Sequence, residues 1–407
     1  MVRLAVWTSQ YPEPYETFIQ GETEHLIEQH PGSTVHVLKG GDGLRPPYVQ
    51  WHRWWSPSAL LMFWVCCLSR TSAMVGILRD LWGGFRDCAR RFERLKSFVV
   101  WPLACQAYHQ FTRQHGPEQA DPEQRILQLA HWTNVPSTIA WMIRRLGGPG
   151  YVMVVHGENL SSTWPLLQHK LDEAAEVLSC TQFNANRLAA AGLRKPVVCP
   201  HGVAIPSDSL PLLGGGQGEG LEQRELKGLS VGRLVPTKGF HILLEALAKL
   251  EGDWTWTFVG DGPERAALEA QATRLGLRHR ITFTGRLPHH EVLSLYPQHP
   301  IFALPFIRNE RGDSDGLPNA LLEAMAAGCA VIASNDAAAP EAIVQGVSGL
   351  LVEPGSVTSL REALAQLKAN ENLLKQLGTG GRAVTMERYE RKSCVERLAT
   401  HFNDLKA

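Results

Sequence analysis

The sequence has no excess of charge of either sign, because its 407 residues include 40 basic and 40 acidic side chains. Proteins that bind nucleic acid usually carry a basic excess, so this balance argues against a nucleic-acid partner. Long apolar runs are also absent. The longest, residues 59–68, is well short of the roughly 20 residues that a membrane-spanning helix needs. We therefore expect no transmembrane segment.

Three further features are missing: cysteine pairs, a leader sequence and a complete dinucleotide fingerprint. None of the eight cysteines forms a C-x-x-C pair, which is typical of reduced thiols in a cytoplasmic protein. The first residues are not a signal peptide, because their apolar run is short and acidic residues follow at once. The G-x-G at 260–262 lacks a third glycine and a suitably spaced acid, which disfavours a redox enzyme. No D-x-D follows a predicted strand and the histidines are scattered, so we expect no metal site.

The sequence does contain a repeated alternation of apolar strands and amphipathic helices, which predicts an α/β fold with parallel sheets and right-handed crossovers. A chain of this length exceeds one ordinary core, so we expect two domains. Prolines, acids and a glycine run mark 205–225 as a linker between domains at 1–204 and 226–385. Residues 356–377 have the pattern of one long helix. Residues 386–407 are predicted to form a helix that crosses back to the first domain.

Residues 40–125 interrupt this alternation with tryptophans and basic side chains. These are Trp51, Trp54, Trp55, Trp64, Trp82 and Trp101, together with Arg70, Arg79, Arg86, Arg90, Arg91, Arg94 and Lys96. Basic residues interleaved with aromatics and an apolar patch are what a helix at a membrane surface needs. The alternative is a helical insertion whose tryptophans form a core and whose arginines form a solvated face. Both interpretations are open; under the first, a lipid that carries the acceptor would bind in this half.

Polar residues follow the predicted strands of the first domain. His131 and Trp132 end one strand, and His156 directly follows the buried strand 151–155. Ligands in open α/β sheets lie outside the carboxyl ends of the strands, so His156 is well placed to meet one. A lone histidine is more often structural, but its position at a strand end before a glycine favours a functional role.

In the second domain, residues 312–328 predict a loop that turns into a helix. Pro318 fits the first helical turn, where a missing N–H costs nothing, and strong helix formers fill 319–327 before a terminating glycine. The backbone N–H groups at such a helix start attract phosphate. Asp315 and Glu323 flank the helix start, which indicates a site for an anionic, hydroxyl-rich ligand such as a sugar nucleotide. The alternative is an N-capping Asp and a surface Glu on an ordinary helix.

A second loop carries two cations, Arg233 and Lys238, after the predicted strand 227–231. Fixed positive charge at this place would stabilise a departing nucleoside diphosphate. Taken alone, the two residues are typical of solvated cations on a protein surface. Together with the stretch 312–328 they indicate a clamp for a pyrophosphate.

Several stretches recur in a defined order and spacing. In the second half they are SVGRLVPTKG (230–239), FVGDGP (258–263), FTGRLPHHEV (283–292), DGLPNALLEAMAAG (315–328) and SGLLVEPG (348–355). These stretches resemble the donor-binding half of the retaining family-4 glycosyltransferases, which have the GT-B fold of two Rossmann-like doubly wound domains facing across a cleft. The first half is more loosely similar to the exopolysaccharide and lipopolysaccharide branch, through YETFIQGE (15–22), AHW (130–132), HGEN (156–159) and CTQFNANRL (180–188). Residues 40–125 have no clear counterpart.

The resemblance implies roles for the matching residues. The carboxylate of Asp315 would contact the donor sugar and that of Glu323 the ribose hydroxyls, while a histidine near the reacting sugar corresponds to His156. The catalytic residues implied in this way are His156, Arg233, Lys238 and Asp315. The donor-binding set is Gly232, Arg233, Lys238, Gly260, Arg286, Leu287, Asp315, Gly316, Leu317, Pro318, Asn319 and Glu323, in which Arg286 and Leu287 meet the base. The acceptor-binding set is Glu16, Thr17, His131 and Asn159.

The sequence departs from the family pattern at three places. Asp315 replaces a commoner Glu, which shortens the reach of the carboxylate. Asn159 stands where an Asp often follows the His-Gly pair. Ala337 and Ala338 stand where two glycines are usual. The last two departures would tune the acceptor pocket or signal lost activity.

The activity that the resemblance implies is transfer of a hexose from a UDP- or GDP-sugar to a glycan or lipid-linked glycan, with retention, in polysaccharide or glycolipid biosynthesis. The leaving phosphate would take the proton of the acceptor, and the clamp cations would replace a divalent ion, so no cofactor and no metal is expected. Two alternatives are a nucleotide-sugar epimerase of the same fold and a catalytically silent sugar-nucleotide-binding subunit. We expect a cytoplasmic protein, with peripheral contact to the inner face of the membrane if residues 40–125 bind lipid. The sequence leaves the oligomeric state open.

Overall fold

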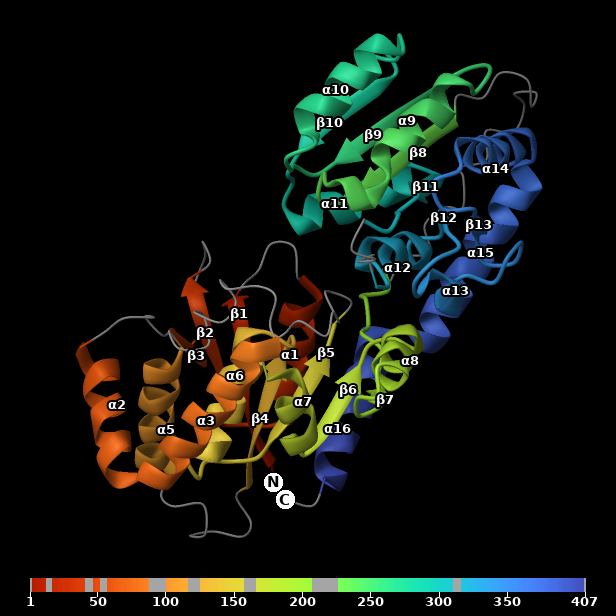
Figure 1. Ribbon diagram of the computed structural model, residues 1–407. Coiled ribbons are helices and arrows are strands. Elements are labelled where there is room, and N and C mark those ends of the chain that lie inside the picture. The colour runs from red at the N-terminus through yellow and green to blue at the C-terminus, as the bar shows by residue number, and fades with distance from the viewer. Residues whose placement is uncertain are drawn as a thin grey trace. The chain divides into compact units, whose positions relative to one another are not determined.

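The computed structural model describes residues 2–11, 17–40, 47–51, 57–87, 100–115, 125–156, 166–206, 226–309 and 316–405. The chain divides into two compact units: unit 1 is Met1–Cys199 with Val395–Ala407, and unit 2 is Pro200–Cys394. Each unit contains one parallel sheet flanked by helices (Figure 1). The predicted α/β class with two doubly wound sheets is therefore confirmed.

The sheet of unit 1 has the strand order β3-β2-β1-β4-β5-β6-β7. The strands are β1 (Val2–Tyr11), β2 (Thr34–Gly40), β3 (Val49–Trp51), β4 (Arg125–His131), β5 (Tyr151–Val155), β6 (Glu176–Ser179) and β7 (Val197–Val198). All five residues of β5 are buried, as expected for a central parallel strand that helices cover on both faces. The order reverses between β1 and β4, so the switch point of unit 1 lies at the carboxyl ends of these two strands.

The helices of unit 1 include one that comes from the far end of the chain. They are α1 (Thr17–Gln29), α2 (Pro57–Ser69), α3 (Thr71–Asp87), α5 (Trp101–His115), α6 (Val135–Arg145), α7 (Leu167–Glu173), α8 (Gln182–Ala190) and α16 (Arg391–Asp404). From Val395 onward α16 belongs to unit 1, where Leu398 and Phe402 pack in one core with Leu4 and Val6 of β1. The helix predicted for 386–407 thus begins at Arg391, and its second part completes the core beneath the first strand.

Unit 2 has the strand order β10-β9-β8-β11-β12-β13. The strands are β8 (Leu226–Val231), β9 (Trp254–Val259), β10 (Ile281–Gly285), β11 (Ile301–Leu304), β12 (Ala330–Ser334) and β13 (Leu350–Val352). The helices are η1 (Pro236–Lys238), α9 (Phe240–Ala248), α10 (Arg265–Arg274), α11 (His289–Leu295), η2 (Tyr296–Gln298), α12 (Asn319–Ala326), α13 (Ala339–Ala342), α14 (Val357–Ala369) and α15 (Glu371–Arg388). Here the order reverses between β8 and β11, which sets the switch point of this unit.

The prediction of a single helix over residues 356–377 was wrong. This segment forms two helices, α14 and α15, which are separated at Asn370. Asn370 has an extended backbone, and its side chain accepts a hydrogen bond from the backbone N–H of Leu373 at 2.9 Å. An Asn in this role is a strong N-cap, so it starts a new helix where the apolar periodicity alone runs on.

The unusual region 40–125 contributes α2, α3 and α5 to unit 1. Its tryptophans do not behave alike, because Trp101 is 6% exposed and Trp64 is 65% exposed. The side chains of Trp51, Trp54, Trp55, Trp82, Arg86, Arg90, Arg91, Arg94 and Lys96 lie outside the described residues. In the part of the chain that the structure describes, no single helix has both the length and the apolar composition to cross a membrane. Ser58–Ser69 and Thr71–Leu81 meet that test only as a pair, and the chain bends by 108° between them.

Candidate functional site

The switch point of unit 2 holds the two predicted clamp cations. Both lie in the loop after β8, where Arg233 is exposed and Lys238 is partly buried at the end of η1. The aliphatic stem of Lys238 lies against Gly232, because a Cβ on that glycine would be 3.4 Å from Lys238 Cε. The loop therefore places two cationic residues at the carboxyl edge of the sheet, where open α/β sheets bind their ligands.

Backbone hydrogen bonds join this loop to its neighbours. The N–H of Leu234 donates to the carbonyl of Asp261 after β9 at 3.0 Å, and the N–H of Gly260 donates to Gly285 at 2.9 Å. On the other side of the switch point, the N–H of Ile307 after β11 donates to Thr237 at 2.8 Å. The loops after four strands are thus fixed to one another, which fixes the backbone positions that carry the two cations.

Gly260 makes the close approach of these loops feasible. Its φ is +136°, and a Cβ at this position would lie 1.9 Å from the carbonyl oxygen of Gly232. Any side chain at Gly260 would push the loop after β9 away from the loop that carries Arg233. The predicted donor-site glycine is therefore required by the packing of the two loops, whether or not it touches a ligand.

The start of α12 faces the same edge of the sheet. Pro318 is the N-cap, with an extended ψ of 127°, and it precedes the first turn of the helix rather than lying within it. It offers no side-chain oxygen, and the first helical bond runs from Leu321 N–H to its carbonyl. The N–H groups of Asn319 and Ala320 precede that bond, so the helix supplies them no acceptor. Such groups, together with the helix dipole, favour an anion.

Glu323 of α12 is buried and held by two side chains that the sequence analysis missed. His289 Nε2 lies 2.8 Å from one carboxylate oxygen, and the Tyr296 hydroxyl donates to the other at 3.0 Å. Burial, followed by the neighbouring Glu323 carboxylate, raises the pKa of Tyr296 well above its ordinary value, so its hydroxyl is a permanent donor. Each carboxylate oxygen has a second lone pair. Glu323 is therefore a fixed acceptor for the hydroxyls of a ligand.

The remaining donor-site residues of unit 2 follow β10 or directly precede α12 in the chain. Arg286 is exposed just after β10, while Leu287 is partly buried and packs against the core. Leu317 also packs against the core, and Gly316 is partly buried. The residue predicted to contact the donor sugar, Asp315, lies outside the described residues.

The backbone of Ala337 gives a physical reason for the glycine that the family pattern has at this place. Its φ is +50°, a left-handed conformation that favours glycine. The neighbouring Asp336, which follows β12, pairs with Arg308 after β11 through two contacts of 2.8 and 3.0 Å from Arg308 Nε. This ion pair joins the strained turn after β12 to the loop after β11. The alanine is therefore accommodated in the backbone conformation that the usual glycine would adopt.

The switch point of unit 1 carries three buried ionisable side chains in a row. His131 ends β4, and its Nδ1 lies 3.2 Å from Nε2 of His156, which directly follows β5. On the other side, His131 Nε2 lies 3.9 Å from a carboxylate oxygen of Glu22 on α1. All three are less than a tenth exposed. The structure thus brings together the two predicted histidines and adds an acid that the sequence analysis did not single out.

Trp132 fixes the histidine pair from the side. Its ring lies 4.3 Å from the ring of His156, centroid to centroid, and its φ is +75°. A non-glycine residue in this conformation is strained, and such strain clusters at functional sites. Of the predicted acceptor residues, Glu16 and Asn159 lie outside the described residues. Thr17 begins α1, but its side chain is not described.

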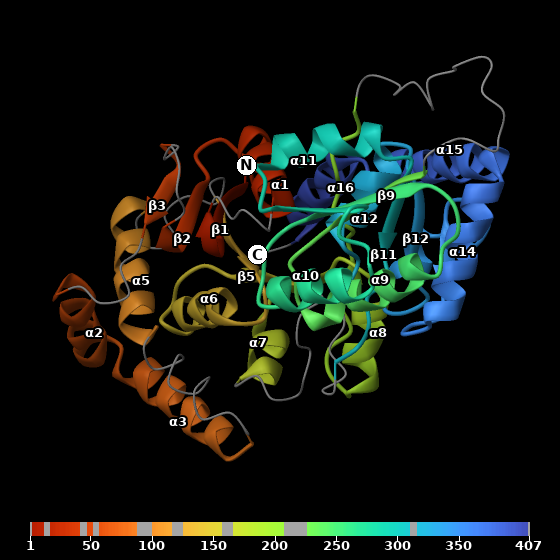
Figure 2. The same ribbon diagram turned by 90° about the horizontal axis from the view of Figure 1, so that it is seen from above.

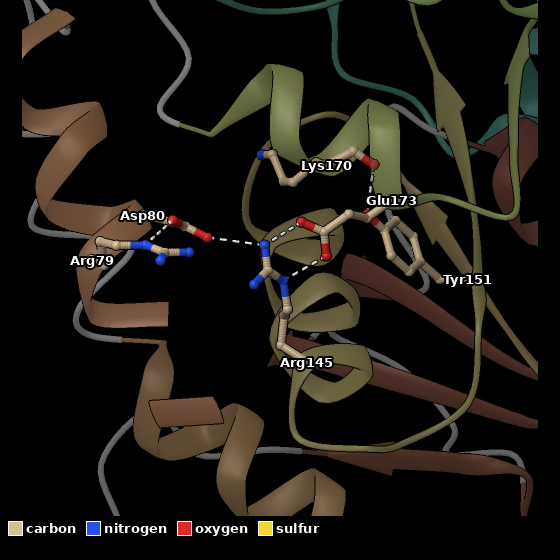
Figure 3. A network of polar contacts seen from close by, with 6 residues as sticks. All are labelled: Arg79, Asp80, Arg145, Tyr151, Lys170 and Glu173. Carbon is tan, nitrogen blue, oxygen red and sulfur yellow. Dashed lines mark hydrogen bonds and ion pairs between the residues drawn. The ribbon is translucent and has the colours of Figure 1, made fainter. Parts of the chain in front are cut away.

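A buried lysine supports the loop that follows His131. Lys170 of α7 is 1% exposed and donates to the carbonyl of Thr133 and, at 3.2 Å, to the hydroxyl of Thr138. Its own carbonyl accepts from the Tyr151 hydroxyl (Figure 3). Burial lowers the pKa of Lys170 to about 7. By these two hydrogen bonds the Lys170 amine stabilises the turn that contains the strained Trp132.

The lowered pKa of Lys170 predicts that the stability of the folded chain depends on pH. Between about pH 7 and the ordinary lysine value of 10.5, the unfolded chain keeps a proton that the folded chain releases, so stability rises with pH. We expect the melting temperature of the wild type, relative to Lys170→Met, to rise as the pH is raised through this window. Lys195→Met, at an exposed position of unit 1, serves as control and should show no such trend. A constant difference between wild type and Lys170→Met at all pH values would contradict the neutral buried amine.

The arrangement of elements matches solved structures of low sequence identity. A structure of Anabaena Alr3699/HepE in complex with UDP and glucose has a TM-score of 0.72 at 16% identity, covering 99% of this chain and 100% of that one. Sucrose-phosphate synthase from Thermosynechococcus elongatus has a TM-score of 0.71 at 17% identity, covering 100% of this chain and 99% of that one. The two parallel sheets define the GT-B fold.

Sequence comparisons give a family for the second half of the chain. Residues 217–384 match the family of glycosyl transferases group 1, so the chain contains a group 1 domain. A GDP-mannose-dependent alpha-(1-6)-phosphatidylinositol monomannoside mannosyltransferase of Mycolicibacterium smegmatis is 31% identical over 171 residues, which cover 41% of this chain and 45% of the relative. A 2-deoxystreptamine glucosyltransferase of Streptomyces kanamyceticus is 30% identical over 250 residues, 55% of this chain and 62% of the relative. The chain spans about half the length of the curated relatives it matches.

Proposed function

We propose that the protein is a retaining glycosyltransferase that moves a hexose from a nucleotide diphosphate sugar to a hydroxyl of a glycan or lipid-linked acceptor. The proposal depends on one observation. At the switch point of unit 2, Arg233 and Lys238 lie at one carboxyl strand edge with two other groups. These are the start of α12, whose N-cap Pro318 has no side-chain oxygen, and a fixed buried acceptor, Glu323. Cations and backbone donors match a diphosphate, and a fixed carboxylate matches a ribose.

The mechanism that we propose is electrostatic. Arg233, Lys238 and the first N–H groups of α12 stabilise the negative charge that develops on the departing nucleoside diphosphate. The leaving phosphate takes the proton of the acceptor hydroxyl, and His156 of unit 1 meets the reacting sugar. The clamp cations supply the charge that a divalent ion supplies elsewhere, so the proposal needs no metal. The group 1 domain and the glycosyltransferase activities of its relatives support this reaction class.

Polysaccharide or glycolipid biosynthesis in the cytoplasm is the setting that we propose. The relatives include a phosphatidylinositol mannoside mannosyltransferase and an amylovoran biosynthesis glycosyltransferase. A solved GT-B structure holds UDP and glucose, which favours a UDP-sugar among the candidate donors, and the mannosyltransferase favours a GDP-sugar. Both donor classes enter the test.

The function is tested by donor binding followed by donor hydrolysis. A bound ligand raises the melting temperature by mass action, so the purified protein is first screened against UDP, GDP and their hexose derivatives. The donor that stabilises it is then incubated without acceptor. Slow release of the nucleoside diphosphate supports a transferase. Binding without any release, even with added glycan acceptors, would indicate the silent subunit, and conversion to an isomeric nucleotide sugar would indicate the epimerase.

We expect Glu22→Gln to slow the transferase reaction without weakening donor binding. The Glu22 carboxylate, 3.9 Å from His131 Nε2, favours a proton on that nitrogen by electrostatic attraction. That tautomer leaves Nδ1 to accept from Nε2–H of His156, which would fix the His156 ring. A neutral glutamine weakens this preference. The turnover should fall roughly tenfold, which corresponds to about 1.4 kcal/mol, and the pH profile of the turnover should shift.

The matched control for this prediction is Glu28→Gln, at an exposed position of the same helix. The KM for the donor should stay constant in both variants, because Glu22 lies in unit 1. An unchanged pH profile in Glu22→Gln, or an equal effect of Glu28→Gln, would show that Glu22 does not position His156.

A further inference from the structure

Helices α2 and α3 expose large apolar side chains that unit 1 does not bury. The exposed fractions are 42% for Leu60, 59% for Leu61, 65% for Trp64, 83% for Leu68, 60% for Val75 and 45% for Leu78. We call these six residues the α2–α3 apolar surface. Both views place α2 at the edge of unit 1, with α5 between it and the sheet (Figures 1 and 2).

The exposed residues of α2 lie on one side of the helix. At about 100° per residue, positions 60, 61, 64 and 68 fall within a single stripe of roughly 100°. Ala59 and Cys66, both fully buried, lie on the opposite side. Because α2 has no charged residue at all, it is apolar all round, and such a helix is normally buried. An exposed apolar stripe of this kind marks a surface that another body covers.

The exposed charged side chains near this surface are basic. Arg79 has 77% of its side chain exposed, and Arg70, at the bend between the helices, is also exposed. Asp80 of α3 is only 8% exposed, and it accepts from Arg145 of α6 at 2.9 Å. The side chain of the second acid of this helix, Asp87, lies outside the described residues. Among the described side chains of α2 and α3, therefore, the exposed charge is the positive one of Arg79.

The same ion pairs anchor α3 with its apolar residues outward. Arg145 lies between Asp80 of α3 and Glu173 of α7, to which its Nε donates at 2.6 Å, while Arg79 Nε contacts Asp80 at 3.2 Å (Figure 3). The buried side of α3 is fixed to α6 through this network. The opposite side, which carries Val75 and Leu78, consequently cannot turn inward without breaking a partly buried ion pair.

We propose that the α2–α3 apolar surface lies on an anionic lipid bilayer. The six apolar side chains would enter the boundary between headgroups and acyl chains, and Arg79 would meet the lipid phosphates. The other arginine of this region, Arg70, donates to the Tyr108 hydroxyl of α5 at 2.6 Å. Two helices joined at a bend of 108° lie flat in an interface more readily than they cross it. Positive charge beside an apolar stripe matches an anionic membrane better than it matches a second copy of this chain, which would bring like charges together. The inference does not depend on the proposed function.

The test is co-flotation of the full chain with vesicles. One set contains phosphatidylcholine with phosphatidylglycerol, and the other contains phosphatidylcholine alone. Leu61→Glu with Trp64→Glu should lower binding to the anionic vesicles by more than tenfold, because two charges would enter the apolar boundary. Arg79→Gln should lower it about fivefold, as expected for one basic residue near the surface, and should change little on phosphatidylcholine.

The chain offers a matched control for this test. Val344→Glu with Val347→Glu places two charges at positions of unit 2 that are 49% and 50% exposed, and it should bind vesicles like the wild type. Because all substituted side chains are exposed, melting temperatures should not change. Leu68→Gln alone, at the most exposed position, provides a milder variant if the double variant folds poorly. Equal binding by all variants, or a wild-type dimer that Leu61→Glu disrupts with no vesicle binding, would overturn the proposal.

Discussion

Replacing Lys238 by alanine should lower the turnover of the nucleotide sugar by about two decades or more, and Arg233→Ala should do the same. Both residues belong to the loop after β8, whose backbone is bonded to the loops after β9 and β11. A cation held in this way needs no reorganisation when charge develops on the departing diphosphate. The loss should therefore appear in kcat more than in KM.

The measurement is the rate of nucleoside diphosphate release, with and without acceptor. Lys249→Ala, at an exposed position just beyond α9 in the same unit, removes a positive charge away from the switch point and should leave the rate near that of the wild type. Near-normal turnover in both Arg233→Ala and Lys238→Ala would remove the clamp from the mechanism. A uniform loss that includes Lys249→Ala would assign the effect to overall charge.

Glu323→Ala should weaken the binding of UDP or GDP by about ten- to one-hundredfold, the effect of losing hydrogen bonds to a charged group. The carboxylate is 9% exposed and fixed by His289 and Tyr296. It therefore presents its remaining lone pairs in a set direction. Calorimetric titration of the nucleotide measures the effect directly.

Two variants make this second result specific. Glu362→Ala, in which the lost carboxylate is 65% exposed on α14, should bind nucleotide like the wild type. Tyr296→Phe keeps the carboxylate and removes only one of its supports, so it should fall between the wild type and Glu323→Ala. Unchanged nucleotide affinity in Glu323→Ala would show that the carboxylate only holds α11 and α12 together.

Local patterns in the sequence were sufficient for the fold and for the parts of the site that lie in single loops. The apolar strands, the glycines at 232 and 260 and the start of α12 are each specified within a few residues, so their positions could be predicted. The partners of Glu323 could not, because His289 and Tyr296 lie 34 and 27 residues earlier in the chain. Their contact depends on how α11 and η2 pack beside α12.

Glu22 shows the same limit in unit 1. It lies on a helix after β1, and its approach to His131 depends on β1 and β4 being neighbours in the sheet. The signal that could have found it is the strand order, since a switch point between β1 and β4 brings α1 and the end of β4 together. The break at Asn370 was missed for the opposite reason. The side chain of Asn370 caps a new helix at this residue, although the apolar periodicity of the sequence continues past it.

The division of α16 between the two units has a consequence for biosynthesis. The first strand of unit 1 is covered by Leu398 and Phe402, which leave the ribosome only after the whole of unit 2. The N-terminal sheet must therefore wait, with part of its apolar face open, while nearly two hundred further residues are made. During that interval we expect a chaperone to bind the exposed apolar face of the nascent chain.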